Sequence, residues 1–140
     1  MTVVFAFLLS TSIYAENNKG GFIVEVNGFQ SSKGIAMITL YDTKDKYDNE
    51  INAFREAQIL NNESRAVWTV NDLPSGEYAI KMYYDENDNG IMDTNFLGIP
   101  KEGFGFSNNA EAELSPPSFE KTMFKINDGV VKQTIQLTYM

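Results

Sequence analysis

The 140-residue sequence contains no cysteine and no histidine. Without cysteine, the chain can form neither a disulfide nor a thiolate metal site. Without histidine, it cannot perform Ser-His-Asp catalysis, bind zinc through imidazole, or use imidazole as an acid or base. The groups that remain for chemistry are carboxylates, amides, hydroxyls, amines and aromatic rings.

Basic residues are also scarce, with 11 Lys and Arg against 19 Asp and Glu, for a formal net charge of -8. A surface of this charge is repelled by phosphate, so we expect neither nucleic acid nor anionic lipid as a partner. The composition is 43% hydrophobic and 13% aromatic, which is enough to build a core. The length allows one domain rather than two.

Residues 1–15 (MTVVFAFLLSTSIYA) combine an apolar run from Val3 to Leu9 with smaller residues that end at Ala15. This order is typical of a secretory signal peptide, and the run is shorter than the about 20 apolar residues of a membrane-spanning helix. We therefore expect cleavage after Ala15 and a single mature domain, residues 16–140, that is exported to the periplasm or the medium and is not membrane-spanning. The alternative is that the run forms an apolar first strand.

Alternating apolar and polar residues predict β-strands along most of the remaining chain. The predicted strands cover residues 22–27, 35–41, 65–70, 78–84, 122–126 and 131–139. Residues 43–57 are charged and weakly helical, and are expected to form a short helix or a loop. Turn residues separate neighbouring strands, most clearly in the LPSGEY segment at 73–78 and in Asn127-Asp128-Gly129.

Six or seven strands with little helix are typical of an all-β protein. We expect a single antiparallel β-sandwich of about seven strands. We expect a Greek-key connection of the Ig-like or prealbumin-like kind, with one long loop. The LPSGEY turn resembles the tyrosine corner of such sandwiches, in which a phenol, here that of Tyr78, hydrogen-bonds back to the preceding connection. The alternative is a plain turn with Tyr78 in the core.

The most informative segment is the acidic loop DENDNGIMD, residues 85–93. Its oxygen-bearing side chains fall at positions 1, 3, 5 and 9, with glycine at position 6, which is most of the calcium-loop pattern D-x-[DN]-x-[DN]-G. Alternate side chains converge as such a loop curls, and residue 7 turns its carbonyl inward. The predicted ligands are Asp85, Asn87, Asn89, the Ile91 carbonyl and Asp93.

This loop is not an EF-hand, because position 12 holds Phe96 instead of a bidentate glutamate and the flanking segments are strands. Glu102, Asn95 or water would have to complete the 6–8 oxygens that calcium takes, and we expect weak binding, with a dissociation constant of about 10⁻⁴–10⁻³ M. The alternative is a solvated turn, since Asp, Asn and Gly are common turn residues. Four acidic residues without a nearby Lys or Arg favour a cation.

The connection from Asn95 to Phe119 is long and too apolar to lie free in water, so it is expected to be functional or packed against the body. Phe104 and Phe106 could be stacking platforms for a sugar or peptide, or could cover one end of the core. Trp68 has the same two interpretations, a core residue or a platform. We favour the core for all three.

The run YYDENDNGIMDTNFLGIPKEGFGFSNNA, residues 83–110, followed by PPSF and an alternating last strand, resembles the bacterial family called domain of unknown function 2141. The likeness covers about residues 20–140 and implies a small exported β-sandwich without an assigned activity. Tyr84 departs from the family pattern, which has histidine there. The family-typical residues present are Asp85, Asn87, Asn89, Gly90, Asp93, Gly98, Pro100, Glu102, Gly103, Gly105, Phe106, Ser107 and Asn108.

These observations favour a non-catalytic accessory module in which a calcium-binding loop orders the long connection. The expected partner of this module is an unknown protein or a cell-surface glycan. A second hypothesis is a carbohydrate-binding module that uses exposed aromatics near the acidic loop, such as Tyr83. A third is a hydrolase with paired carboxylates, for example Asp93 and Glu102, which would require a cleft and a separation of about 5–10 Å.

Overall fold

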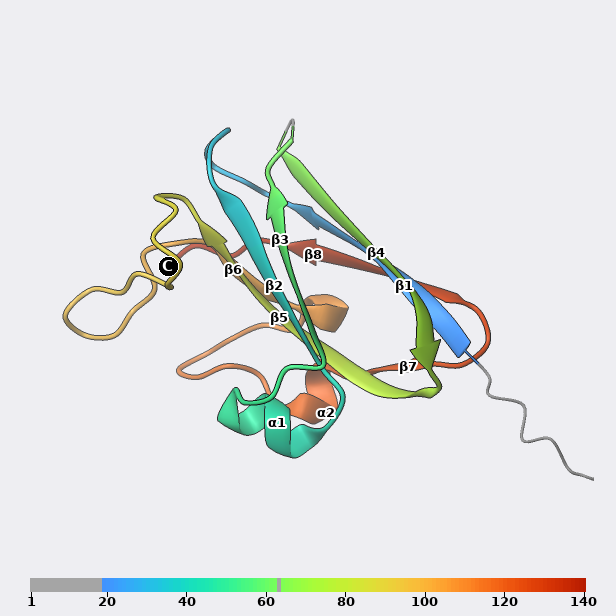
Figure 1. The fold of residues 1–140 in the computed structure, drawn as a ribbon. Helices are drawn as coiled ribbons and strands as arrows, with labels where there is room; N and C mark the ends of the chain where they lie inside the picture. The colour runs from blue at the N-terminus through green and yellow to red at the C-terminus, as the bar shows by residue number, and fades with distance from the viewer. Residues whose placement is uncertain (1–18, 63) are drawn as a thin grey trace, which may run out of the picture.

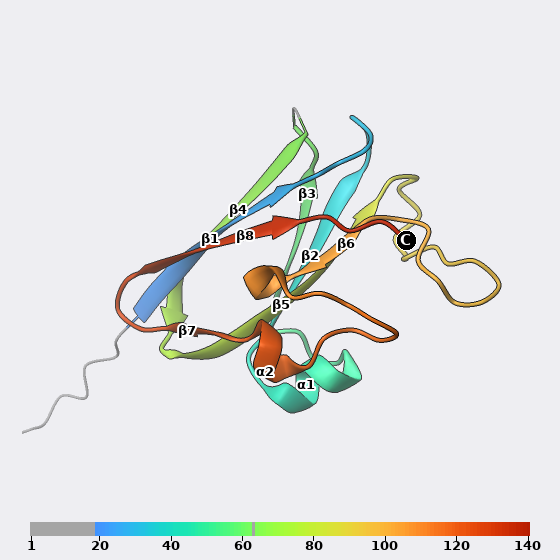
Figure 2. The ribbon, with the colours of Figure 1, turned by 180° about the vertical axis from the view of Figure 1, so that it is seen from behind.

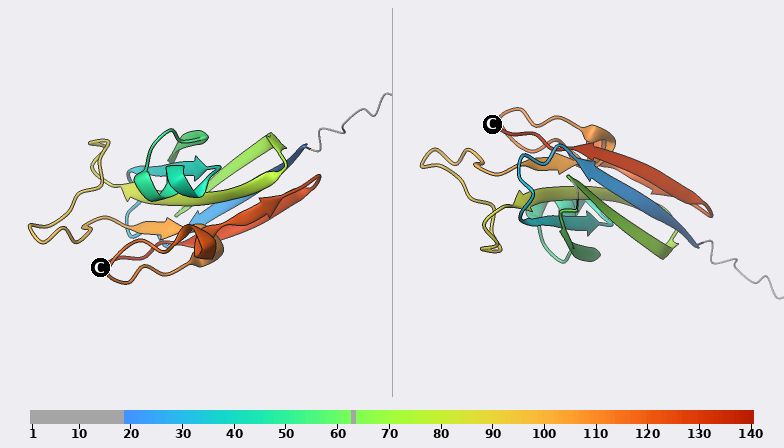
Figure 3. Two further views of the ribbon diagram at one scale, coloured as in Figure 1. Left: turned by 90° about the horizontal axis from the view of Figure 1, so that it is seen from below. Right: turned by 90° about the horizontal axis from the view of Figure 1, so that it is seen from above.

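The computed structural model of the chain describes residues 19–62 and 64–140. The predicted signal peptide, residues 1–15, lies outside the described residues, so its prediction stays untested. The described chain forms two β-sheets that pack face to face, as the edge-on views of Figure 3 show.

Eight strands make up the two layers (Figure 1). The first sheet has the order β4-β1-β8, with bounds Arg65–Pro74, Lys19–Asn27 and Val130–Gln136. The second has the order β3-β2-β5-β6, with bounds Arg55–Leu60, Ile35–Tyr41, Gly76–Asp85 and Phe104–Phe106, and β7 (Phe124–Ile126) pairs with the start of β5.

The predicted all-β sandwich is confirmed. All strand pairs are antiparallel except β1 and β8, which run parallel side by side. Two strands lie where none was predicted. In β3, only Ala57 and Ile59 are half-buried, so its alternation is too faint to recognise in the sequence, and part of it falls in the predicted helix or loop 43–57. The other, β6, has only three residues, and one of them is Gly105.

The core lies between the sheets and is built from the alternating residues that the sequence placed on one face of each strand. The inward series of β5 is Tyr78, Ile80, Met82 and Tyr84, all of which are buried. The other buried residues of the sandwich include Phe22, Val24, Val26, Ala36, Ile38, Leu40, Ala66, Val70, Ile126, Ile135 and Leu137. Burial of this many large apolar side chains is the main source of stability for a chain without disulfides.

The phenol of Tyr78 donates a hydrogen bond of 2.7 Å to the carbonyl of Pro74, four residues earlier in the β4–β5 connection. The bond has the character expected of a tyrosine corner, and it spans the turn at which the chain passes from the first sheet to the second. Tyr78 is also buried in the core. Both interpretations of this residue therefore hold together.

Two short helices cover the outer face of β5 (Figure 2). The first, α1 (Lys44–Asn49), is the predicted short helix, and the Thr43 side chain caps it by accepting a hydrogen bond from the Lys46 amide. The second, α2 (Phe119–Thr122), was not predicted. The phenol of Tyr47 on α1 donates to the carbonyl of Pro117, just before α2, and so ties the two helical segments together. In the described part of the chain, no helix has the length and apolarity that crossing a membrane requires.

Two polar side chains of the GFSN segment fasten the end of the long connection to the sandwich. Ser107, which is fully buried in the 3-10 turn Ser107–Asn109, accepts a hydrogen bond of 2.9 Å from the Ile80 amide and donates to the Thr122 carbonyl at 2.5 Å. Asn108 donates its backbone amide to Gln133 Oε1 at 2.7 Å and its side-chain amide to the carbonyls of Lys121 and Met123. Ser107 and Asn108 therefore have a structural role.

We predict that Ser107→Ala lowers the free energy of unfolding by about 2–4 kcal/mol, because a buried N–H and a buried carbonyl each lose their partner. Urea unfolding followed by Trp68 fluorescence measures this change. Ser32→Ala, at an exposed loop position, is the control and should leave stability within about 0.5 kcal/mol of the wild type. Equal stability of the two variants would contradict the assigned role of Ser107.

Candidate functional site

The acidic loop lies at one end of the sandwich, between the end of β5 and the start of β6. Figures 1 and 3 show it projecting from the end of the molecule opposite the start of β1. Asp85 is the last residue of β5 and Glu102 comes two residues before β6, so the sheet positions the two ends of the loop. The six residues predicted as ligands all belong to this one connection.

Two buried carboxylates fasten the loop through its own backbone. Asp85, 1% exposed, accepts the amide of Asn89 on Oδ1 at 3.2 Å and the amide of Gly90 on Oδ2 at 2.8 Å. Glu102, 4% exposed, accepts the amides of Glu86 and Asp93 on its two oxygens, each at 3.1 Å. Each of the four carboxylate oxygens therefore takes one backbone N–H.

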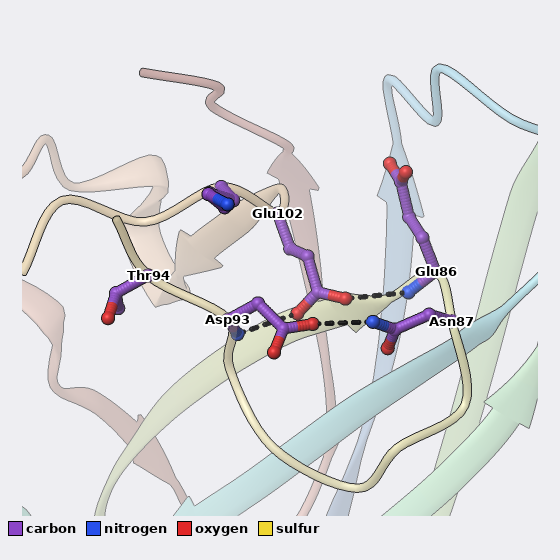
Figure 4. Close-up of a pocket in the computed structure, with 6 residues that line it drawn as sticks. Glu86, Asn87, Asp93, Thr94 and Glu102 are labelled. Carbon is purple, nitrogen blue, oxygen red and sulfur yellow. Dashed lines mark hydrogen bonds between the residues drawn. The ribbon is translucent and has the colours of Figure 1, made fainter. Parts of the chain in front are cut away.

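The side chains at loop positions 3, 5 and 9 converge as the pattern predicts. Asn87 donates its side-chain amide to Asp93 at 2.7 Å, and Asn89 donates its own to the two oxygens of Asp93 at 2.9 and 3.0 Å. Figure 4 shows Asn87 and Asp93 facing each other beside the Glu102 carboxylate. Gly90, at position 6, has a φ of +78°, the left-handed conformation that the turn requires.

At Ile91, whose carbonyl is the predicted ligand, the backbone amide donates to Asn89 Oδ1 at 3.1 Å and the side chain is exposed. Asn95, considered as an additional ligand, turns into its own segment and accepts the amides of Leu97 and Ile99 at 2.8 and 3.1 Å. The structure thus brings Asn87, Asn89 and Asp93 together, with Asp85 and Glu102 forming the base of the loop.

The donor set can accommodate a hard cation only after a local change. Asn87 and Asn89 present N–H groups to Asp93, and rotating these amides would present their oxygens instead. Among the residues that the structure describes, no group of three or more Asp, Glu, His or Cys side chains is arranged to hold a metal. Any cation here would therefore depend on amide and backbone oxygens as well as on carboxylates, which is chemistry that calcium accepts.

The surface beside the loop forms an open hollow of about 420 Å³. It is lined by Glu86, Asn87, Asp93, Thr94, Lys101 and Glu102, five of which are labelled in Figure 4. Lys101 is the basic residue of this set.

Two carboxyl groups in the hollow have pKa values shifted in opposite directions. Hydrogen bonds from Asn89 and then Asn87 lower the pKa of Asp93 below its ordinary value, so the loop favours an ionised Asp93. Burial raises the pKa of Glu102 above its ordinary value, against the opposing effect of the amides of Asp93 and Glu86. The hollow therefore holds one carboxylate that stays ionised and one that takes up a proton more readily.

The aromatic residues singled out as possible platforms are placed differently. Phe104 and Phe106 are 6% and 7% exposed and meet edge to face, with ring centroids 6.1 Å apart, which confirms their interpretation as core. Trp68 is partly buried and packs edge to face on Phe22 at the margin of the core. Tyr83 is half-buried, and its phenol donates to the Gly90 carbonyl of the acidic loop at 3.0 Å.

Of the two alternatives for the 95–119 connection, functional or packed against the body, packing does not hold for its first part. Phe96 is 95% exposed and Leu97 is 69% exposed, whereas Phe119 is buried. The reason is a tight turn, in which the Gly98 amide donates to the Asn95 carbonyl and the Asn95 amide donates to the Ile99 carbonyl. This turn directs the intervening residues away from the sandwich. The sequence carries a signal for this turn, the Asn and Gly three residues apart.

We predict that Glu102→Gln destabilises the protein at pH 7 by about 1–3 kcal/mol, because glutamine has one acceptor oxygen for two amide donors. The wild type should also show a component of stability that is present at low pH and lost as the pH rises through the raised pKa of Glu102, and the variant should lack it. Urea unfolding at several pH values between 3 and 7 measures both effects. Glu86→Gln, an exposed carboxyl in the same loop, is the control.

Unchanged stability of Glu102→Gln, or a pH profile identical to that of the wild type, would show that Glu102 does not fasten the loop.

A family model described as an uncharacterized protein conserved in bacteria (DUF2141) matches residues 24–134. No curated protein and no solved structure matches the sequence. The matched residues make up well over half of the chain and include the acidic loop, Glu102 and the GFSN segment. The chain therefore belongs to this family of uncharacterised bacterial proteins, as the resemblance of its motifs indicated.

Proposed function

We propose that this protein is an exported, non-catalytic accessory module whose 85–93 loop binds calcium weakly and thereby orders the end of the sandwich that meets a partner. The observation that carries the calcium proposal is the convergence of Asn87, Asn89 and Asp93, at positions 3, 5 and 9 of the loop, within hydrogen-bond distance of one another. The three side chains bond to one another, and turning the two asparagine amides would direct their oxygens to the same point as the Asp93 carboxylate.

The electrostatics of the loop support the same proposal. Asp85, Glu86, Asp88 and Asp93 lie within nine residues that contain no Lys or Arg, and a cation would reduce their mutual repulsion. Asp93 has a lowered pKa, so it is ionised and ready to bind a cation at neutral pH. Binding must replace the three hydrogen bonds that Asn87 and Asn89 donate to Asp93, which accounts for a weak affinity.

The carboxylates of the loop also support a non-catalytic role. A general acid or nucleophile needs a carboxyl group that is free to reach a substrate. Asp85 and Glu102 are buried, with every oxygen accepting a backbone amide. Breaking these bonds would release the loop, so we assign both residues to its architecture and not to hydrolysis.

We predict that 10 mM CaCl₂ stabilises the protein by about 1.4–2.7 kcal/mol if the dissociation constant is about 10⁻⁴–10⁻³ M. This corresponds to a rise in Tm of about 4–10 °C, measured by calorimetry against a chelator-treated sample. Asp93→Asn should remove the rise, and the matched control Asp88→Asn, at an exposed position that is not a predicted ligand, should keep it. Unchanged melting of the wild type in calcium would defeat the proposal.

We predict that the full chain, expressed in a bacterial host with a carboxyl-terminal tag, is recovered from the periplasm or medium without residues 1–15. Intact-mass measurement of the purified product identifies the cleavage site. A variant in which Leu8 and Leu9 are replaced by Asp should stay unprocessed, because a charged segment cannot act as the apolar part of a signal peptide. Wild-type product that stays in the cytoplasm with residues 1–15 attached would contradict the proposed export.

A further inference from the structure

The turn beyond the acidic segment carries three exposed apolar side chains. Phe96 is 95% exposed, Leu97 69% and Ile99 39%. We call these three residues the apolar tip. Six of the other seven phenylalanines that the structure describes are buried, and the seventh, Phe54, is partly buried against the core. Figures 1 and 3 show the segment around residue 96 reaching furthest from the sheets at this end of the molecule.

The apolar tip is held in one conformation by its own hydrogen bonds. Asn95 Oδ1 accepts the amides of Leu97 and Ile99, and the backbone of Asn95 pairs with Ile99 and Gly98 at 2.9 and 3.0 Å. Below this turn, the Lys101 amide donates to the Asp93 carbonyl at 2.8 Å, and Thr94 pairs with Pro100. A side chain that is exposed on a rigid turn loses little conformational entropy when a partner covers it, which is the property of a binding anchor.

The charges around the apolar tip restrict the kind of partner. Residues 85–102 contain five Asp and Glu against one basic residue, Lys101, and Glu86 and Asp88 are exposed. An anionic lipid surface is repelled by this loop, and a second copy of a chain with a net charge of -8 is repelled as well. A basic rim around an apolar pocket complements both the charge and the shape of the loop.

We propose that the apolar tip is the anchor of a protein–protein interface, in which Phe96 and Leu97 enter an apolar pocket that is bordered by Lys or Arg on the partner. The acidic loop contacts the basic rim and steers the approach. This interface goes beyond the proposed calcium binding: the hydrogen bonds of Asn95 form the turn that carries Phe96 and Leu97, whereas the proposed ion orders the neighbouring 85–93 loop.

Photocrosslinking identifies the partner. The full chain is produced in its source bacterium with a photoreactive phenylalanine analogue in place of Phe96, and separately in place of Leu114, which is equally exposed on a different segment. The expected result is one protein that is crosslinked from position 96 and not from position 114. A crosslink to lipid, a crosslink to a second copy, or no crosslink at all overturns the proposal.

The purified partner then provides a quantitative test. Phe96→Ser and Leu97→Ser should each weaken its binding about 30-fold or more, whereas Leu114→Ser should leave the affinity unchanged. Raising NaCl from 50 to 500 mM should slow association, because the basic rim is screened. Equal melting temperatures of the variants establish that the fold is intact. Binding that is insensitive to Phe96 and Leu97, or independent of salt, overturns the proposal, whatever the outcome of the calcium experiment.

Discussion

Two buried carboxylates determine the shape of the functional end of this protein. Asp85 and Glu102 lie at the two ends of the 85–102 segment and together accept four backbone amides, one on each oxygen. An isolated buried charge is costly, and here the amides supply the compensation, although burial still raises the pKa of Glu102. These contacts, together with the bond of 3.0 Å from the Tyr83 phenol on β5 to the Gly90 carbonyl, fix the acidic loop relative to the β-sheet.

In this arrangement, the residues that hold the loop in place are different from the residues that could face a ligand. Asp85 and Glu102 face the backbone, whereas Asn87, Asn89 and Asp93 face one another at the surface. The two asparagine amides act as donors to Asp93 and so satisfy its charge in the absence of a cation. The loop is therefore a closed hydrogen-bonded unit, and a cation can enter it only after the two asparagine amides turn.

The sequence was sufficient to predict the strands whose alternation is long, such as Ile35–Tyr41, and the convergence of the loop side chains, because both follow from periodic spacing. It could not reveal β3, whose inward positions are only half-buried, or α2, which is one turn long. It also gave no direct signal that Glu102 bonds the amides of Glu86 and Asp93, because such contacts depend on how a loop closes in three dimensions. The exposure of Phe96 was missed because composition alone predicts burial.

The parallel pairing of β1 with β8 has a consequence for how the chain acquires its structure. Val24 on β1 lies opposite Gln133 on β8, so the central strand of the smaller sheet lacks one neighbour until the chain has been synthesised as far as residue 136. Closure of such a distant pair is entropically costly, and a nascent chain that lacks β8 cannot complete the hydrophobic interior, to which Ile135 belongs. The smaller sheet can consequently be completed only after every strand of the larger sheet has been synthesised.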